Sequence, residues 1–440
     1  MRGKKIRKWF IVSIVSIVGL LLVSFLGVSG VLAKKTTVEY WSFRTEMEPQ
    51  GQHLLWVKKG FEATHPNIKL NLVWAGQNLL QRVRPRLVVG NPPDVIVYNQ
   101  PGIDRLIEEG LLYPLDELMN QKAFDQDILF KDTFVPLILE SSRLVSKGRY
   151  YCAPRDVTVS GFFYNKKMFE DFGLKVPETW SEFKNVCEVL KSNGIAPLSQ
   201  DGTVSFYNDW YFLWFASRLA GAEKVLATGL NKPGTSWKDP EFLQAAKMVR
   251  ELRDKGYFVK GFEGSAYPGS QMDWARGVTA MIFCGSWLPN EVSNVMPEGF
   301  QFGIFRFPAI EGGKGDPTTI ELWPFPYAIP KDAKHIPEAM EFIRYALSKK
   351  VALEQVKSAR IPSAIKGVPS PIDGMSEMLA SANKFVSNKQ GLAYAAPEWL
   401  SNVLEPLDDL LIWGKITPQE FIKRLDEKHR AYYEIEKKKK

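Results

Sequence analysis

Aromatic side chains that stand beside charged and amide side chains are the feature of this sequence best suited to chemistry. The 440 residues include 13 tryptophans. Trp41 ends an early β-type run, Trp287 follows an apolar run, and Trp323 precedes a Pro-Phe-Pro sequence. A pyranose ring stacks its apolar face on an aromatic plane and offers its hydroxyls to carboxylates, amides and guanidinium groups. The pattern predicts a carbohydrate-binding surface, although core packing is the ordinary role of any single tryptophan.

A second aromatic group lies between positions 207 and 214, beside an acidic side chain. Its members are Tyr207, Asp209, Trp210, Tyr211 and Trp214. We predict a loop here, in which these side chains face a ligand. Trp399, which follows Pro397 and Glu398, is a further candidate of the same kind.

Motifs for covalent chemistry are absent from the sequence. There is no G-x-S-x-G, H-E-x-x-H, Walker or G-x-G-x-x-G pattern. The four histidines have no metal-ligand spacing, so we expect no metal, no cofactor and no catalytic residue. A glycoside hydrolase stays open as an alternative, because it needs only two carboxylates about 5–10 Å apart. The three cysteines, an odd number without a C-x-x-C pair, are expected to be buried free thiols.

The first 33 residues have the layout of a secretory signal peptide. A basic head precedes a long uncharged run, which ends in Val31-Leu32-Ala33. The run is long enough to span a bilayer, which takes roughly 20 residues, so an uncleaved anchor is the alternative. We therefore predict an exported protein, periplasmic or at the cell surface, and tethered if the leader stays uncleaved.

Net charge argues against a nucleic-acid partner. The formal charge is +8, but five positive residues lie in the leader and four are Lys437 to Lys440. The remaining body is close to neutral, so phosphate neutralisation would contribute little. Residues 436–440 are expected to form a solvated, frayed basic tail. The roughly 400 residues after the leader suffice for two domains.

The elements that must position these side chains alternate between strand and helix. Strands are predicted at 37–41, 68–73 and 94–98, and helices at 53–65 and 79–89. This alternation predicts an α/β protein with βαβ units and a mostly parallel sheet. Ligands of such sheets bind outside the carboxyl ends of the strands, which places the segments after Trp41 and Tyr98 at a site.

Later helices have clear start signals. Thr179 and Glu182 form a capping box, and Asp239 precedes a proline at the first helical position. Two further helices are expected to start at Pro337 and near Thr417. The turn-rich residues 312–319 are predicted to form an exposed loop.

Three stretches in the middle of the chain read as one signature: GRYYxxP at 148–154, FYNKKMF at 163–169 and GLxxPxTWxEF at 173–183. This signature resembles the extracellular solute-binding proteins of carbohydrate ABC importers, the group that includes maltose-binding protein. Shorter pieces agree in order along nearly the whole chain: NPPDV at 91–95, EGLxxPLD at 109–116, LKxxGxxP at 190–197, GxxAMxxxGSW at 277–287, EAMxFI at 338–343 and GKITP at 414–418.

The resemblance implies a periplasmic-binding-protein fold, with two α/β lobes, a hinge and a ligand cleft between the lobes. It implies chain crossings near 154–158, 322–326 and 361–366. The lobes would then comprise 36–155 with 325–362, and 158–322 with 366–435. It also implies a monomer that captures a sugar, closes over it and delivers it to the membrane permease of an importer.

The resemblance also implies ligand contacts for particular residues. These contacts are Trp41, Arg44, Asn99, Arg155, Asp156, Asp209, Tyr211, Trp287 and Trp399; Trp323 is a further candidate, an extra aromatic residue by which the chain departs from maltose-binding protein. The match is outright for the glycine-aromatic turn at Trp287, whereas Trp399 matches only by spacing. Thr158 stands where maltose-binding protein has a glutamate, so maltose is not the expected sugar. A polyamine or peptide ligand in the same fold is the other alternative; a polyamine would need acidic side chains and aromatic rings with no arginine nearby.

Overall fold

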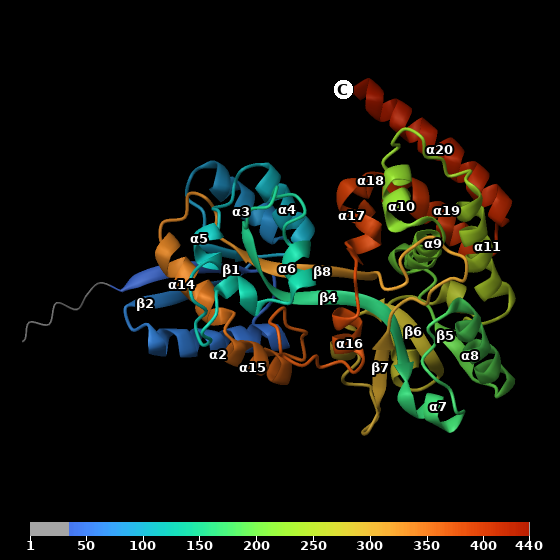
Figure 1. Cartoon of the computed structure of the whole chain (residues 1–440), viewed down its shortest axis with the longest axis horizontal. Helices are drawn as coiled ribbons and strands as arrows, with labels where there is room; N and C mark the ends of the chain where they lie inside the picture. Colours follow the sequence, from blue (N-terminus) through green and yellow to red (C-terminus); the bar gives the residue numbers. More distant parts are fainter. Residues whose placement is uncertain (1–34, 440) are drawn as a thin grey trace, which may run out of the picture.

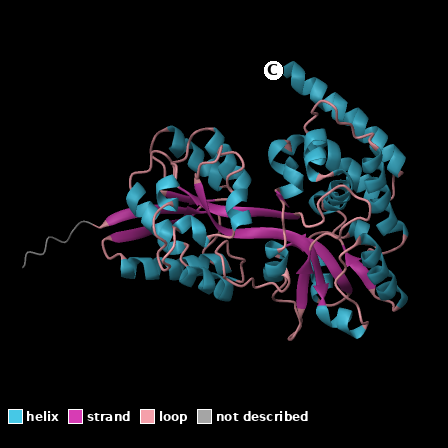
Figure 2. Cartoon of the chain, in the orientation of Figure 1, coloured by secondary structure: helices cyan, strands magenta, loops and turns pink. Residues whose placement is uncertain are grey.

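The computed structural model describes residues 35–439 of the chain, and its strands join into one mixed sheet that runs through the molecule (Figure 2). The strands are β1 (Thr36–Ser42), β2 (Ile68–Trp74), β3 (Val95–Val97), β4 (Cys152–Asn165), β5 (Ala196–Ser199), β6 (Thr279–Gly285), β7 (Phe302–Phe305), β8 (Ile320–Ala328) and β9 (Phe385–Val386). Their order is β2-β1-β3-β8-β4-β6-β5, with β7 paired to β4 and β9 to β8.

Helices cover the sheet in both halves of the molecule (Figure 1). The α-helices are α2 (Pro49–Thr64), α3 (Leu79–Val88), α4 (Gln100–Glu108), α5 (Asp116–Met119), α6 (Pro136–Ser141), α7 (Lys166–Asp171), α8 (Trp180–Ser192), α9 (Ser205–Ala220), α10 (Ala222–Gly229), α11 (Pro240–Asp254), α12 (Gly269–Ala275), α13 (Leu288–Glu291), α14 (Ile336–Ala346), α15 (Lys349–Ala359), α16 (Met375–Ala380), α17 (Leu392–Ala395), α18 (Pro397–Trp399), α19 (Glu405–Ile412) and α20 (Pro418–Lys439). Shorter helical turns are η1 (Phe130–Thr133), η2 (Phe262–Gly264), η3 (Asn388–Gly391) and the π-helical η4 (Leu400–Leu404).

Two long antiparallel strands connect the two lobes. The first part of β4 pairs with β8, from Cys152 opposite Ala328 to Val159 opposite Leu322. From Ser160 onward, β4 pairs with β6 and β7 instead. Figure 1 shows β4 and β8 running from the lobe that holds β1–β3 into the lobe that holds β5–β7. The two-lobed α/β architecture expected from the sequence is therefore confirmed.

The parallel βαβ arrangement is confirmed at both ends of the sheet but not in its middle. β1 pairs in parallel with β2 and β3, and β5 pairs in parallel with β6. In the middle of the sheet, the pairs β3–β8, β8–β4 and β4–β6 are antiparallel. A mostly parallel sheet was thus too simple an expectation, because strands that cross between lobes need no helical crossover to pair antiparallel.

A third segment lies along the two long strands where they cross. The amide of Val157 donates to the carbonyl of Pro362 at 3.3 Å, and the amide of Ala364 donates to the carbonyl of Arg155 at 3.2 Å. Asp156 and Ser363 form an antiparallel bridge. Residues 361–366 therefore run beside β4 between the lobes.

The helix starts predicted from capping signals are confirmed. Thr179 and Glu182 form a reciprocal capping box at the start of α8. Proline occupies the first turn of α11, where a missing N–H costs nothing. Helix α2 begins at Pro49, a turn before the predicted start at His53, because Pro49 also suits a first helical position.

The aromatic group at 207–214 is not in a loop, as we had predicted, but in the helix α9. Nearly every residue of α9 from Tyr207 to Ala220 is buried. A helix that is apolar on all sides has no polar stripe to reveal its period, and it is stable only when surrounded. α10, α11 and α19 pack around α9 and provide that environment.

The C-terminal end of the chain differs from the predicted frayed tail. α20 continues to Lys439, so residues 436–439 are helical instead of frayed. The predicted leader, residues 1–33, lies outside the described residues. Among residues 35–439, no helix combines the length and apolar character needed to cross a bilayer. Cys152, Cys187 and Cys284 are buried free thiols, as predicted.

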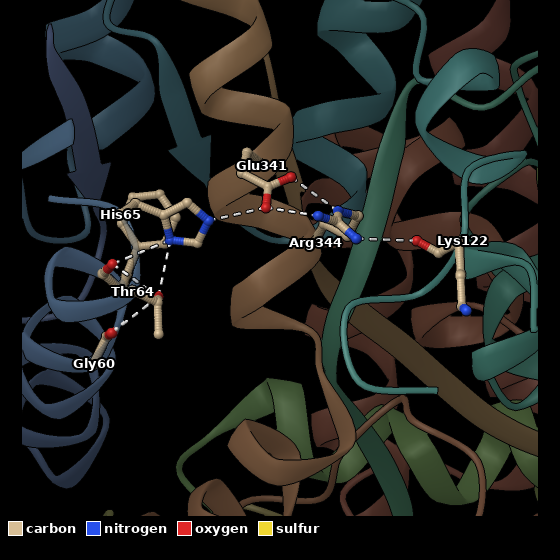
Figure 3. Close-up of polar contacts among 7 residues, drawn as sticks. Gly60, Thr64, His65, Lys122, Glu341 and Arg344 are labelled. Carbon is tan, nitrogen blue, oxygen red and sulfur yellow. Dashed lines mark hydrogen bonds and ion pairs between the residues drawn. The ribbon is translucent and has the colours of Figure 1, made fainter. Parts of the chain in front are cut away.

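A polar network holds helices α2 and α14 together in the first lobe (Figure 3). Nε2 of His65 lies 3.0 Å from Oε1 of Glu341. Arg344 donates to both oxygens of Glu341, at 2.6 and 2.9 Å, and to the carbonyl of Lys122 at 3.3 Å. The network thereby links the end of α2, the helix α14 and the loop at Lys122.

Candidate functional site

Two adjoining chambers lie where the crossing segments meet. The inner chamber has a volume of about 260 Å³ and the outer chamber about 470 Å³. Both are lined by Arg44, Thr158, Trp287, Glu291 and Phe325. Two other hollows, of about 540 and 640 Å³, open on the second lobe and contain no tryptophan. The pair of chambers is the better candidate because it joins side chains from both lobes.

Each chamber adds its own lining to these shared residues. The inner chamber adds Glu48, Pro49, Gln50, Asp156, Val157, Ser286, Asn290, Ile361 and Pro362. The outer chamber adds Phe43, Gln77, Asn99, Pro101, Tyr207, Tyr267, Trp323 and Asn388.

Trp287 is the central aromatic side chain of the site. It follows β6, and its ring lies directly over Gly285, where an added Cβ would stand 2.0 Å from Cζ3 of the indole. The indole stacks on Trp210 at 6.2 Å and 24°, and it approaches Trp323 at 5.9 Å and 56°. Glycine at 285 is thus required for close approach of the ring, instead of for a turn as we had expected.

Arg44 brings positive charge to both chambers. Its guanidinium lies 4.4 Å from the centroid of Phe43 and 5.7 Å from that of Phe325, which stack on each other at 5.2 Å and 8°. Nη1 donates to Glu48 at 3.3 Å. Burial lowers the pKa of Arg44, while the nearby Asp156 carboxylate opposes that shift. Nε of Arg44 is buried without a hydrogen-bond partner. An arginine packed against an aromatic pair with an N–H group to spare suits hydroxyl acceptors.

Asp156 provides a buried carboxylate at the inner chamber. Its Oδ2 accepts from Nη2 of Arg155 at 2.7 Å, and its Oδ1 is buried without a hydrogen-bond partner. Burial by itself would lower the pKa of Arg155, but the charge of Asp156, the Tyr327 and Tyr40 hydroxyls and the hydrogen bond to Asp156 together outweigh that effect and raise it. A buried, unpaired carboxylate oxygen beside a chamber is an acceptor for a ligand hydroxyl.

A second acidic side chain lies at the rim. The hydroxyl of Tyr267 donates to Oε1 of Glu291 at 3.0 Å. Desolvation raises the pKa of Glu291, this hydrogen bond lowers it, and the charge of Asp201 raises it further. Desolvation and the neighbouring carboxylate raise the pKa of Tyr267 to about 12. The site therefore offers acceptors and donors of both charge signs.

The structure places the predicted contacts in three groups. At the chambers lie Arg44, Asn99, Asp156, Trp287 and Trp323. Arg155 lies just behind Asp156 in a small internal space, and Oδ1 of Asn99 already accepts from the amide of Gly102 at 2.9 Å. Away from the chambers lie Trp41, Asp209, Tyr211 and Trp399.

These last four predicted contacts need correction, because each side chain has another partner. Trp41 donates to Glu39 at 2.7 Å and is covered by two arginines. Asp209 is fully buried in an ion pair with Lys389. Tyr211 packs among core phenylalanines, and Trp399 stacks on Trp237 at 5.5 Å and 7°. In the described residues, none of the four reaches either chamber.

Several lining residues were not predicted. Ser286, Asn290 and Glu291 flank Trp287 in sequence, and Phe325 lies in a predicted crossing, so these positions carried a signal that we did not use. Asn388 carried none, because it reaches the outer chamber from η3, a segment far beyond β8 in the sequence.

The chambers suit stacking and hydrogen bonding more than metal or cofactor binding. Within residues 35–439, no group of three or more His, Cys, Asp or Glu side chains is arranged to hold a metal ion. Aromatic rings and charged or amide side chains of mixed sign line the chambers together. Such a lining matches a hydroxyl-rich, uncharged ligand.

Comparisons with known proteins identify the family of the chain. The family described as bacterial extracellular solute-binding protein matches residues 47–353. A multiple sugar-binding protein of Streptococcus mutans is 26% identical over 364 residues, which cover 80% of this chain and 81% of that protein. A diacetylchitobiose binding protein of Streptomyces coelicolor is 25% identical over 324 residues, covering 70% of this chain and 66% of that protein.

Solved structures show the same fold. The apo-form of RafE from Streptococcus pneumoniae superposes with a TM-score of 0.72 at 21% identity, covering 90% of this chain and 97% of RafE. A chitin oligosaccharide binding protein superposes with a TM-score of 0.70 at 24% identity, covering 90% of this chain and 99% of that one. The family model matches most of the length of the chain. The chain therefore belongs to the bacterial extracellular solute-binding proteins.

Proposed function

We propose that this protein captures a sugar, specifically an oligosaccharide, between its two lobes and delivers it to the membrane permease of an ABC importer. The observation that carries the proposal is that the Trp287 ring lines both chambers together with Arg44, and lines the inner chamber together with Asp156. Relatives whose names state that they bind sugars support it. We further propose that the protein acts as an exported monomer and changes no covalent bond in its ligand.

The proposed mechanism is lobe closure over the ligand. We assign residues 36–155 and 325–362 to one lobe, and 158–322 and 366–435 to the other. The crossing segments around Asp156, Phe325 and Pro362 would then act as the hinge. A ligand drives closure only to the extent that it binds the closed form more tightly than the open form. The closed arrangement would present both lobes together to the permease.

The proposed ligand contacts are Arg44, Asn99, Asp156, Trp287 and Trp323. Arg155 would act indirectly, because its guanidinium holds one oxygen of Asp156 and leaves the other free for the ligand. Arg44 disfavours a polyamine, since a second cation in the same chamber would be repelled. A peptide stays an alternative because backbone groups could use the same donors and acceptors.

The test is a thermal-shift screen of the purified chain, followed by calorimetry with every compound that shifts the midpoint. The screen contains raffinose, diacetylchitobiose, maltotriose, spermidine and short peptides. A ligand at 100 times its Kd should stabilise the native state by about 2.7 kcal/mol. Trp287→Ala should abolish the shift, whereas Trp56→Ala, which truncates a tryptophan exposed outside the chambers, should keep it.

Each outcome has a definite meaning. A shift with one class of sugar that disappears in Trp287→Ala supports the proposal. A shift with spermidine or a peptide alone would refute the sugar and leave the binding role standing. Consumption of an oligosaccharide during incubation would identify the protein as a hydrolase.

A further inference from the structure

The short segment η3 carries an unusual backbone beside the outer chamber. Lys389 has φ 56° and ψ 46°, Gln390 has φ 54° and ψ 28°, and Gly391 has φ 90°. Residues with a Cβ disfavour this left-handed region, so two of them in succession persist only where the surroundings hold them. The preceding residue, Asn388, lines the outer chamber.

The surroundings that hold this backbone centre on the side chain of Lys389. Lys389 is fully buried, and its Nζ donates to Oδ1 of Asp209 and to the carbonyl of Phe206, both in α9. Its backbone amide donates to Oε1 of Glu321 in β8 at 2.6 Å. Glu321 in turn accepts from the hydroxyl of Ser160 in β4. One residue therefore ties η3 to a helix and to both crossing strands.

The same ammonium group lies against the aromatic platform. Nζ of Lys389 is 4.2 Å from the ring centroids of Phe206 and of Trp210. Trp210 is the ring on which Trp287 stacks. The position of Lys389 is thus linked to Trp287 on one side and to Asn388 on the other.

Asn388 itself lacks a partner for a buried polar atom. Its Oδ1 is buried and accepts no hydrogen bond within the described residues. The same chamber is lined by the rings of Trp323, Tyr207 and Phe325 and by polar side chains such as Arg44 and Asn99. Buried amide oxygens are nearly always satisfied, so this one indicates an acceptor waiting for a donor from the ligand.

We propose that Asn388 determines ligand specificity by hydrogen bonding to a hydroxyl of the bound ligand, and that Lys389 is the positioning residue that holds it there. This inference rests on the proposed function, because it requires a ligand with hydroxyl donors. It also accounts for Asp209: this carboxylate acts on the ligand through Lys389 and Asn388 instead of touching it.

The test measures Kd by calorimetry with whichever of raffinose, diacetylchitobiose and maltotriose binds the wild-type chain most tightly. Asn388→Ala should weaken binding about tenfold or more, the effect of losing a good hydrogen bond to an otherwise unpaired group. It should leave the unfolding midpoint of the ligand-free protein unchanged. The matched control is Asn383→Ala, an exposed asparagine in the same lobe that lines neither chamber.

The positioning role of Lys389 is tested by a double-mutant cycle. Lys389→Met should weaken binding and lower the midpoint, and Asp209→Asn serves in the same cycle if Lys389→Met does not fold. Combined with Asn388→Ala, either change should weaken binding by clearly less than the product of the single effects. A merely structural role would lower the midpoint and leave the two effects on Kd independent.

Three results would overturn the inference. Unchanged affinity in Asn388→Ala would remove the contact while the sugar-binding role stands. Independent effects in the cycle would remove the positioning role. A wild-type chain that binds none of the three sugars would overturn the proposed function, and this inference with it.

Discussion

Replacing Gly285 with alanine should weaken ligand binding by displacing Trp287 while the fold stays intact. An added Cβ would stand 2.0 Å from Cζ3 and 2.4 Å from Cε3 of the indole. Non-bonded carbon atoms are at their optimum about 3.5–4.0 Å apart, so the ring must move by about 1.5 Å. The backbone tolerates alanine, because Gly285 lies in β6 and is not among the positive-φ glycines.

The expected loss follows from what the displaced ring can no longer do. Trp210 and Trp323 lie on its other sides, so the indole cannot shift without leaving its stacked position. A lost ring stack is worth about 0.5–1.5 kcal/mol beyond the buried area. The Kd for the sugar should therefore rise about 3- to 10-fold, less than or equal to the rise in Trp287→Ala.

Calorimetry with the sugar that gives the largest thermal shift measures this effect. Gly264→Ala is the matched control, since a Cβ there meets no heavy atom within 4 Å and the backbone is not left-handed. Unchanged affinity in Gly285→Ala, alongside a clear loss in Trp287→Ala, would refute the reasoning. It would mean that the ring binds the ligand from a position other than the one over Gly285.

Three further predictions concern stability. Burial and the charge of Arg155 lower the pKa of His53 from 6.5 to about 4, so the unfolded chain binds more protons between these values. His53 thus contributes stability that is present above pH 6.5 and lost as the pH falls through about 4, up to about 3 kcal/mol. His53→Gln should flatten urea-unfolding free energies across that window, and an unchanged slope would contradict the assignment. Arg218 donates to the carbonyls of Asp316 and Phe307 at 2.6 Å and of Thr319 at 3.0 Å. Arg218→Met should cost about 3–5 kcal/mol in urea unfolding and leave sugar affinity unchanged; a loss below about 1 kcal/mol would show that water replaces these bonds. Glu341→Gln removes the carboxylate that joins His65 to Arg344 in Figure 3 and should cost about 1 kcal/mol. High salt should shrink that difference, and a salt-independent loss would argue for packing instead.

The helices and strands within the lobes were predictable because each is signalled by nearby residues. The capping box at Thr179, the proline before α11 and the short alternating runs of β1 and β2 each depend on residues within one turn or one strand. The sequence signature at 148–183 added the order in which those elements pack. The antiparallel pairing of β4 with β8 had no local signal, because the paired residues lie more than 160 positions apart in the sequence.

The candidate site was predictable only where its residues lie next to strand ends or crossings. Arg44, Asp156, Trp287 and Trp323 follow or lie within such segments and line the chambers. The ligand contacts predicted for Asp209 and Tyr211 were wrong because α9 is buried on nearly every side. No periodicity in its sequence therefore shows which face meets a ligand.

By itself, the sequence determined the α/β class, the two lobes and the aromatic, mixed-charge character of the binding surface. The α/β class and the character of the surface follow from local propensity, capping and composition, which neighbouring residues decide, whereas the two lobes followed from the resemblance of the signature to the solute-binding proteins. Only the tertiary structure decided which aromatic rings face the chambers and which polar groups find partners. Lys389 shows the reason: its buried ammonium meets Asp209 and Phe206, and its backbone amide meets Glu321. These partners come from distant segments, and no sequence pattern records that meeting.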